Sequence, residues 1–161
     1  MSVKLTGKDS LLEYYRFHCN ATAWISLISA FVFVIWPSMI DSKEFLSYCI
    51  LVAGWSIPRF IFGVFMSCSP LFDEDAELAK ISSGFFFRLP IALSAIGLME
   101  VLFGVFLFAS HCVTSEEFGS SSFALAAAML QFVLDMCIAR VTFTISHVYL
   151  TTPKGEKEED V

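Results

Sequence analysis

The sequence predicts an all-α integral membrane protein, a four-helix bundle of two antiparallel hairpins with both termini on the inner, positively charged side. The chain of 161 residues is 57% hydrophobic and only 16% charged, which is more apolar surface than one small water-soluble core buries. Several stretches are long and apolar enough to cross a bilayer, which takes about 20 residues. Basic residues outside these stretches gather on one side of the expected membrane. Lipid is therefore expected to cover much of the chain.

Hydrophobic stretches of the required length are expected to form four transmembrane helices. In chain order these spans cover residues 21–39, 45–68, 86–110 and 123–149. Pro37 closes the first span, and Pro58 lies inside the second. The last span is longer than a bilayer requires, so it is expected to tilt or to protrude.

Basic residues set the expected orientation. On one side of the spans lie Lys4, Lys8, Arg16, Lys80, Arg88, Lys154 and Lys157, and on the other lies Lys43. The positive-inside rule places the richer side in the cytoplasm, or in the matrix or stroma of an organelle. Both termini and the loop 69–85 are then inside, and the turns 40–44 and 111–122 are outside. The helices therefore pair as two hairpins.

The chain divides into three expected parts. Residues 1–20 form an N-terminal interfacial segment, or simply an ordered entry to the first span. Residues 21–150 form the four-helix transmembrane domain, and residues 151–161 form a polar acidic tail. The acidic loop 69–85 is either a helix on the membrane surface or a solvated connector.

Two similar heptapeptides carry opposite charges in the middle of the second and third spans. Residues 59–65 read RFIFGVF and residues 100–106 read EVLFGVF. A charge in mid-span costs roughly 2.5 to 3.5 kcal/mol on insertion scales and usually faces a partner. Antiparallel helices bring their midpoints to one depth, so we expect a structural ion pair between Arg59 and Glu100. Replacing Glu100 with Gln is then expected to leave Arg59 uncompensated.

Small residues share the helix faces of these charges. Gly63 follows Arg59 by four positions, and Gly97 and Gly104 flank Glu100 at spacings of three and four. Such spacings place residues on one face of a helix, where small side chains allow backbones to approach closely. We expect these two small-residue faces to oppose each other. The predicted helix-packing residues are Gly63, Gly97, Gly104 and, in the fourth span, Ala128.

The fourth span carries two polar stripes. Gln131 and Asp135 lie on one stripe, and Arg140 and His147 lie on the other. At 100° per residue, Arg140 is about 140° around the helix from Asp135. One stripe is expected to face the bundle and the other a partner protein or lipid headgroups. All four residues are candidates for the partner-facing or lipid-facing role.

Motifs for catalysis and metal binding do not occur in the sequence. It has no Ser-His-Asp set, HExxH motif or phosphate-binding glycine loop. It also has no Cys-x-x-Cys pair and no basic footprint for nucleic acid. No catalytic residue, metal or cofactor is therefore predicted, whereas bound lipids are expected. A disulfide between Cys49 and Cys112 and free thiols at these positions both stay open.

These features favour a non-catalytic accessory or structural subunit of a larger membrane complex. Its expected partners are other membrane subunits and lipids, in a hetero-oligomer without nucleic acid. Arg59, Glu100, Asp135 and Arg140 sum to zero charge, which favours structural pairing over an ion path. The mitochondrial inner membrane is the expected location, because respiratory and ATP synthase assemblies collect such subunits. The alternative is a small ion or proton transporter or a channel subunit.

Short motifs along the chain resemble the Frag/DRAM/Sfk family of multi-pass membrane proteins. They are Tyr-Arg-Phe at 15–17, Pro-Arg-Phe at 58–60, Glu100, Ser-Glu-Glu-Phe at 115–118 and Cys-Ile-Ala-Arg at 137–140. The resemblance covers roughly residues 11–141, with gaps between the motifs. It implies a Golgi or ER membrane factor for remodelling glycosylphosphatidylinositol (GPI) anchors. Family members have more spans and a longer first luminal loop, so no catalytic role is carried over.

Overall fold

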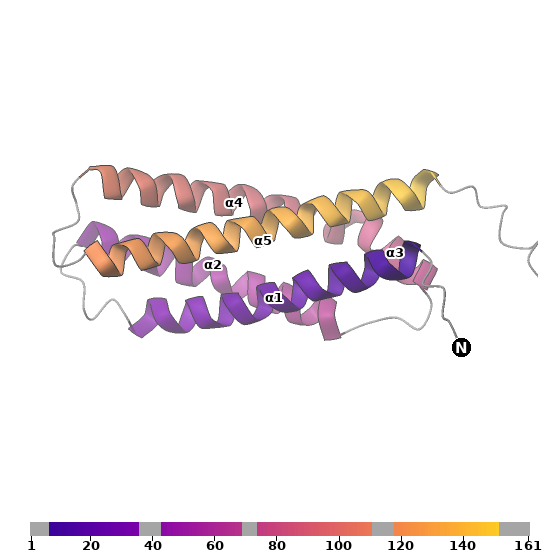
Figure 1. Cartoon of the computed structure of the whole chain (residues 1–161), viewed down its shortest axis with the longest axis horizontal. Coiled ribbons are helices and arrows are strands. Elements are labelled where there is room, and N and C mark those ends of the chain that lie inside the picture. Colours follow the sequence, from indigo (N-terminus) through magenta and orange to yellow (C-terminus); the bar gives the residue numbers. More distant parts are fainter. Residues whose placement is uncertain (1–6, 36–42, 69–73, 111–117, 152–161) are drawn as a thin grey trace, which may run out of the picture.

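The protein is all-α. The computed structural model describes residues 7–35, 43–68, 74–110 and 118–151. The helices are α1 (Gly7–Ile35), α2 (Lys43–Cys68), α3 (Glu74–Ser82), α4 (Gly84–Ala109) and α5 (Phe118–Thr151). Figure 1 shows α1, α2, α4 and α5 lying side by side along the long axis, successive long helices running in opposite directions, and the short α3 at one end.

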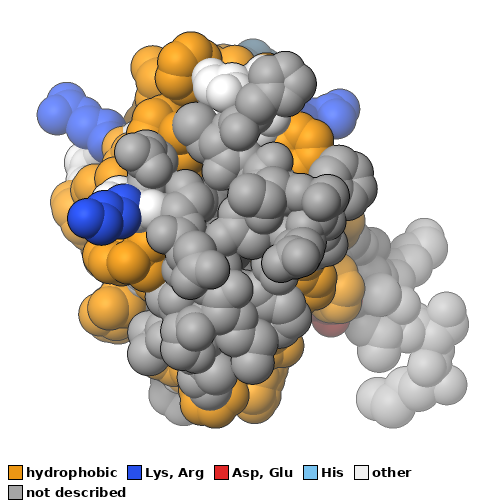
Figure 2. Space-filling model, turned by 90° about the vertical axis from the view of Figure 1, so that its left-hand side faces the viewer, with side chains coloured by type: hydrophobic (Ala, Val, Ile, Leu, Met, Phe, Trp, Pro, Cys, Tyr) orange, Lys and Arg blue, Asp and Glu red, His pale blue; other side chains and the backbone are white. Residues whose placement is uncertain are grey.

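Three of the helices are long and apolar enough to cross a membrane. They contain the candidate spans Leu46–Cys68, Gly84–Ala109 and Ser122–Val148, and no other helix qualifies among the described residues. The expected first span, 21–39, continues past Ile35, where the described part of α1 ends. Hydrophobic side chains surround the sides of the molecule in the end-on view of Figure 2. These features are consistent with an integral membrane protein.

Helix α1 is longer than the sequence predicts at its N-terminal end. It runs without a break from Gly7 to Ile35, across the expected boundary between residues 20 and 21. After Gly7 the segment contains no Gly or Pro that would end a helix. Leu12, Tyr15 and Cys19 are buried, so this part of α1 belongs to the core.

Two of the sequence-based expectations fall outside the described residues. Cys112, the proposed partner of Cys49 in a disulfide, lies in the range 111–117, and the tail after Thr151 lies in the range 152–161. Within the described part of the chain, Cys19, Cys49, Cys68 and Cys137 are free thiols.

The acidic loop between α2 and α4 contains a helix that is docked on the bundle. Leu78 and Ile81 of α3 are fully buried, and their spacing of three places them on one helix face. The neighbouring Glu77 is also buried and forms an ion pair with Arg16 of α1. Helix α3 contacts α4 and α5. It is therefore part of the packed core at this end of the molecule.

The core consists of two hydrophobic clusters. One gathers residues from all five helices around the end where α3 lies: Leu12, Tyr15, Cys19, Phe62, Met66, Leu78, Ile81, Leu93, Ile138, Val141 and Ile145. The other, toward the opposite end, contains Tyr48, Cys49, Val52, Ala53, Leu107, Ala124 and Ala128. Along α2, α4 and α5, the residues between the two clusters include buried polar side chains: Ser56, Arg59, Glu100, Gln131 and Asp135. This polar layer is the candidate functional site.

Candidate functional site

The centre of the polar layer is a triad of one guanidinium and two carboxylates. Arg59 on α2 donates from Nε to Oδ2 of Asp135 on α5 at 2.7 Å. It also donates from Nη1 and Nη2 to Oε1 and Oε2 of Glu100 on α4, at 3.3 and 2.9 Å. The side chain of Arg59 is 0% exposed, and the two acidic side chains are each 1% exposed. The triad therefore joins three helices in the interior.

Helix spacing and one glycine position the triad. Arg59 and Ser56 share a face of α2 because they are three residues apart. Gly97 lies one turn before Glu100, and a Cβ atom there would be 3.3 Å from both Nη2 of Arg59 and Oδ2 of Asp135. The missing side chain of Gly97 leaves room for the guanidinium between α4 and α5. The expected ion pair between Arg59 and Glu100 is thus present, with Asp135 as an additional partner.

The predicted role of Asp135 and Gln131 is wrong. Both were candidates for facing a partner protein or lipid, but both are buried and turn toward α2. Asp135 contacts Arg59, and Gln131 donates from Nε2 to Oγ of Ser56 at 2.9 Å. The physical reason is that Arg59 has a third donor direction, along Nε, which Glu100 does not use. The other stripe differs, since Arg140 and His147 are exposed.

This arrangement also changes the charge count. Arg140 is exposed on the opposite stripe of α5 and takes no part in the buried cluster. Among the described residues, Arg59 is the only cation in ion-pair contact with Glu100 or Asp135. With both acids ionised, the triad carries a net charge of −1, one cation against two anions. The neutral sum of four intramembrane charges therefore does not describe the buried site.

The small residues allow close packing of helices, as expected, but their neighbours differ from the predicted ones. A Cβ atom on Gly63 would lie 2.6 Å from the Cys19 carbonyl oxygen and 2.9 Å from the Ala23 backbone nitrogen. Gly63 thus faces α1, whereas Gly104 makes room for the Tyr48 ring of α2. The idea that the small-residue faces of α2 and α4 oppose each other is therefore wrong. Fully buried Ala128 packs in the cluster around Tyr48.

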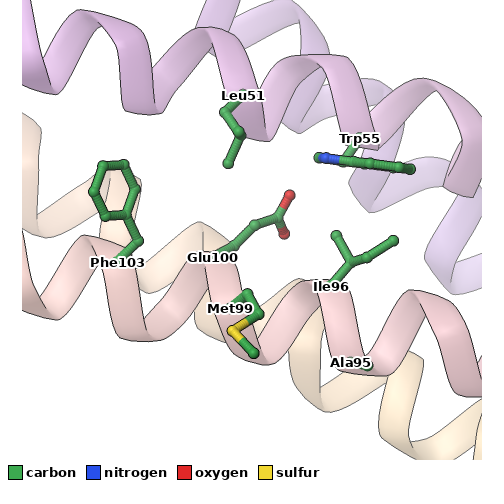
Figure 3. A pocket seen from close by; sticks show the side chains of 7 residues that line it. All are labelled: Leu51, Trp55, Ala95, Ile96, Met99, Glu100 and Phe103. Carbon is green, nitrogen blue, oxygen red and sulfur yellow. The ribbon is translucent and has the colours of Figure 1, made fainter.

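A groove opens beside the triad between α2 and α4, with a cavity volume of about 430 Å³. Helix α2 contributes Leu51 and Trp55, and α4 contributes Ala95, Ile96, Met99, Glu100 and Phe103. Figure 3 shows the Glu100 carboxylate directed from α4 toward α2, with Leu51 and Trp55 on the far side. We call this feature the α2/α4 groove. Among the described residues, Glu100 is the only charged one that lines it.

Some contacts were missed at the sequence level. The ion pair between Arg16 and Glu77 joins α1 to α3, but no local spacing links residues that lie 61 positions apart. The place of Asp135 had a usable signal: it shares a stripe with Ala128, which was already expected to pack against another helix. Residues on one stripe face one way, so a packing residue indicates where its polar neighbours point.

The chemistry available at this site is ion pairing and hydrogen bonding. Within the described ranges, no group of three or more His, Cys, Asp or Glu side chains is placed to hold a metal ion. No protein-family model, no curated protein sequence and no solved protein structure matches this chain.

Proposed function

We propose that this protein is a non-catalytic subunit of a larger membrane assembly, anchored as a four-span bundle of two hairpins. In the polar layer, buried side chains of α2, α4 and α5 join these helices to one another, as the triad and the pair of Ser56 and Gln131 do. The outer surface of the same helices is rich in exposed large apolar side chains. These buried polar side chains thus hold the helices of the bundle together, which supports a structural role.

Arg140 is the observation that carries the proposal of a protein partner. It is exposed, yet it lies within the candidate span Ser122–Val148. Val148 lies eight positions further along the chain, about 12 Å along the helix axis. An exposed guanidinium at that depth is costly in hydrocarbon unless it reaches the headgroups or meets an acidic partner. We propose that this stripe of α5, with His147, contacts a neighbouring subunit.

Replacing Arg140 with Leu is expected to reduce the recovery of partner chains severalfold when the tagged protein is purified in mild detergent. A charge paired across an interface leaves its partner's charge unpaired when it is removed. Arg88→Leu is the matched control, because Arg88 is an exposed arginine on α4. Quantitative mass spectrometry of both purifications checks the result. A wild-type chain that runs as a stable monomer without partners would contradict the proposal.

The proposed orientation places the C-terminal end of α2 on the inner side. Cys68 is exposed there, so a membrane-impermeant maleimide is expected to label a Cys112→Ser variant only after sealed membranes are permeabilised. Cys19 is expected to stay unlabelled until the protein is unfolded. Its side chain is 0% exposed in the core, so the reagent reaches the thiol only after unfolding. Labelling of Cys68 from outside intact, sealed membranes would reverse the orientation.

For the location, we propose the mitochondrial inner membrane, where a matrix-facing pair of termini matches the positive-inside orientation. A Golgi or ER location would instead favour the GPI-anchor remodelling role that the family resemblance implies. Fluorescence microscopy of the tagged chain together with markers of both compartments distinguishes these two locations.

A further inference from the structure

We propose that α1 and α5 form a buried site for a small monovalent cation, sodium, beside Asp135. The oxygen ligands are the Asp135 carboxylate, the amide oxygen of Gln131 and the hydroxyls of Thr22 and Ser26. Such a site differs from a cluster of His, Cys or acidic side chains, because most of its ligands are the uncharged oxygens that hard cations accept. This inference goes beyond the structural role and depends only on the packing of α1 against the triad.

Three of these oxygens are buried and have no hydrogen-bond partner among the described residues. They are Oγ1 of Thr22, Oγ of Ser26 and Oε1 of Gln131, and the three residues are 2%, 0% and 1% exposed. Unpaired buried polar atoms are costly, and in native proteins they usually contact a water molecule or an ion. Gln131 donates from Nε2 to Ser56, which leaves Oε1 as an acceptor without a donor. A cation satisfies such an acceptor.

Helix geometry brings Thr22 of α1 opposite Asp135 of α5. The two helices contact each other and run in opposite directions (Figure 1). The hydroxyls of Tyr15 and Thr142 lie close together across this interface, although they form no hydrogen bond of normal geometry. Thr22 follows Tyr15 by seven positions, and Asp135 precedes Thr142 by seven. Seven residues are about two helical turns, so Thr22 and Asp135 lie at one level and on facing sides.

One turn further along the interface, Ser26 lies opposite Gln131. Ser26 follows Thr22 by four positions, and Gln131 precedes Asp135 by four, which keeps each residue on the same face of its helix. The register agrees with the next turn, where Ser29 of α1 and Ala127 of α5 line one cavity. The four oxygen-bearing side chains therefore come from adjacent turns of two facing helices.

The charge of the triad selects a monovalent cation. One guanidinium lies against two carboxylates, so one negative charge is in excess when both acids are ionised. Both oxygens of Glu100 accept from Arg59. Asp135 accepts from Arg59 through Oδ2, which leaves Oδ1 for a cation. A monovalent ion makes the buried cluster neutral, whereas a divalent ion would leave an uncompensated positive charge in the interior.

The test is equilibrium binding of radioactive sodium to the full-length protein in phosphatidylcholine nanodiscs, at slightly alkaline pH and constant ionic strength. Binding is expected to saturate, and an excess of choline, which is too bulky for a buried site, is expected not to displace the sodium. Asp135→Asn removes the excess charge and is expected to abolish binding. Thr22→Val removes one ligand, leaves the triad intact and is expected to weaken binding by about tenfold or more.

Thr142→Val is the matched control. Thr142 is also buried, and its hydroxyl has no partner in the described part of the chain. It lies about 10 Å along the helix axis from Asp135, so its loss is expected to leave sodium binding unchanged. A loss of affinity in Thr22→Val alone then cannot come from the removal of a buried hydroxyl as such.

Three results would overturn the proposal. One is the absence of saturable sodium binding to the folded wild type, which would point to a protonated acid in the triad. Another is equal displacement by choline, which would mean that sodium gathers only at the surface of an acidic chain. The third is equal affinity in Thr22→Val and Thr142→Val. The recovery of partner chains in the Arg140 experiment does not depend on sodium, so this inference and the proposed function fail separately.

Discussion

Replacing Arg59 with Met is expected to destabilise the folded protein by about 3 to 5 kcal/mol, the usual cost of removing one partner from a buried ion pair. The change leaves Glu100 and Asp135 close together without a cation in the interior. Single neutralisation, Glu100→Gln or Asp135→Asn, is expected to cost much less, because Arg59 then keeps one carboxylate for its one charge. Reversible unfolding in mixed micelles with increasing SDS measures the free energy of unfolding of each variant.

The double variant Glu100→Gln/Asp135→Asn is the decisive control. It leaves Arg59 uncompensated, so its loss of stability is expected to exceed the sum of the two single losses. Equal losses for Glu100→Gln and Arg59→Met would contradict the shared pairing.

Folded Asp135→Asn protein in vesicles also tests the transport alternative. If the wild type conducts protons or ions and this variant does not, the triad lines a path rather than serving as a structural clamp.

Replacing Gly63 with Ala is expected to destabilise the packing of α1 on α2 by about 1 to 3 kcal/mol, the typical cost of overpacking. The added Cβ atom would lie 2.6 Å from a carbonyl oxygen and 2.9 Å from a backbone nitrogen of α1. Backbone atoms cannot adopt another rotamer as a side chain can, so α1 and α2 must move apart. The same unfolding assay in mixed micelles measures the change.

Gly54→Ala is the matched control on the same helix. Nothing lies within 4 Å of the position that its Cβ would take, and alanine favours a helix by about 1 kcal/mol over glycine. This variant is therefore expected to be neutral or slightly more stable. Gly104→Ala is expected to fall between the two, because its nearest neighbour is the end of the Tyr48 side chain, which can shift. Equal stability of the Gly63 and Gly54 variants would contradict the close approach of α1 and α2.

The sequence predicts the long helices better than the relations between them. The expected spans 45–68, 86–110 and 123–149 fall close to α2, α4 and α5, because apolar runs and turn residues are local signals. The burial of the N-terminal part of α1 in the core and the docking of α3 were not predicted. Both depend on contacts with distant residues, such as Glu77 with Arg16. Local composition carries no information on such contacts.

Only part of the candidate site was predicted, because the sequence shows the charged residues but not how the helices that carry them pack together. The charges at Arg59 and Glu100 could be identified from the sequence, because each lies in the middle of an apolar run. Asp135 was equally visible, and Ala128 on its stripe indicated that it faces another helix, but a helical projection does not say which helix. Only the placement of α5 against α2 and α4 assigns Asp135 to Arg59. The groove beside Glu100 was not predictable at all, because it arises from the spacing between two helices.

The triad also sets an order of events during synthesis. Arg59 lies 41 residues before Glu100 and 76 residues before Asp135 in the chain. At about 5 to 20 residues per second, Asp135 is made roughly 4 to 15 s after Arg59. For a chain inserted as it is made, the guanidinium of Arg59 has neither carboxylate partner until Glu100 is made, 41 residues later and roughly 2 to 8 s at this rate. The insertion machinery or local water must solvate that charge until then. The first hairpin reaches its final packing only when the last helix, α5, has been inserted.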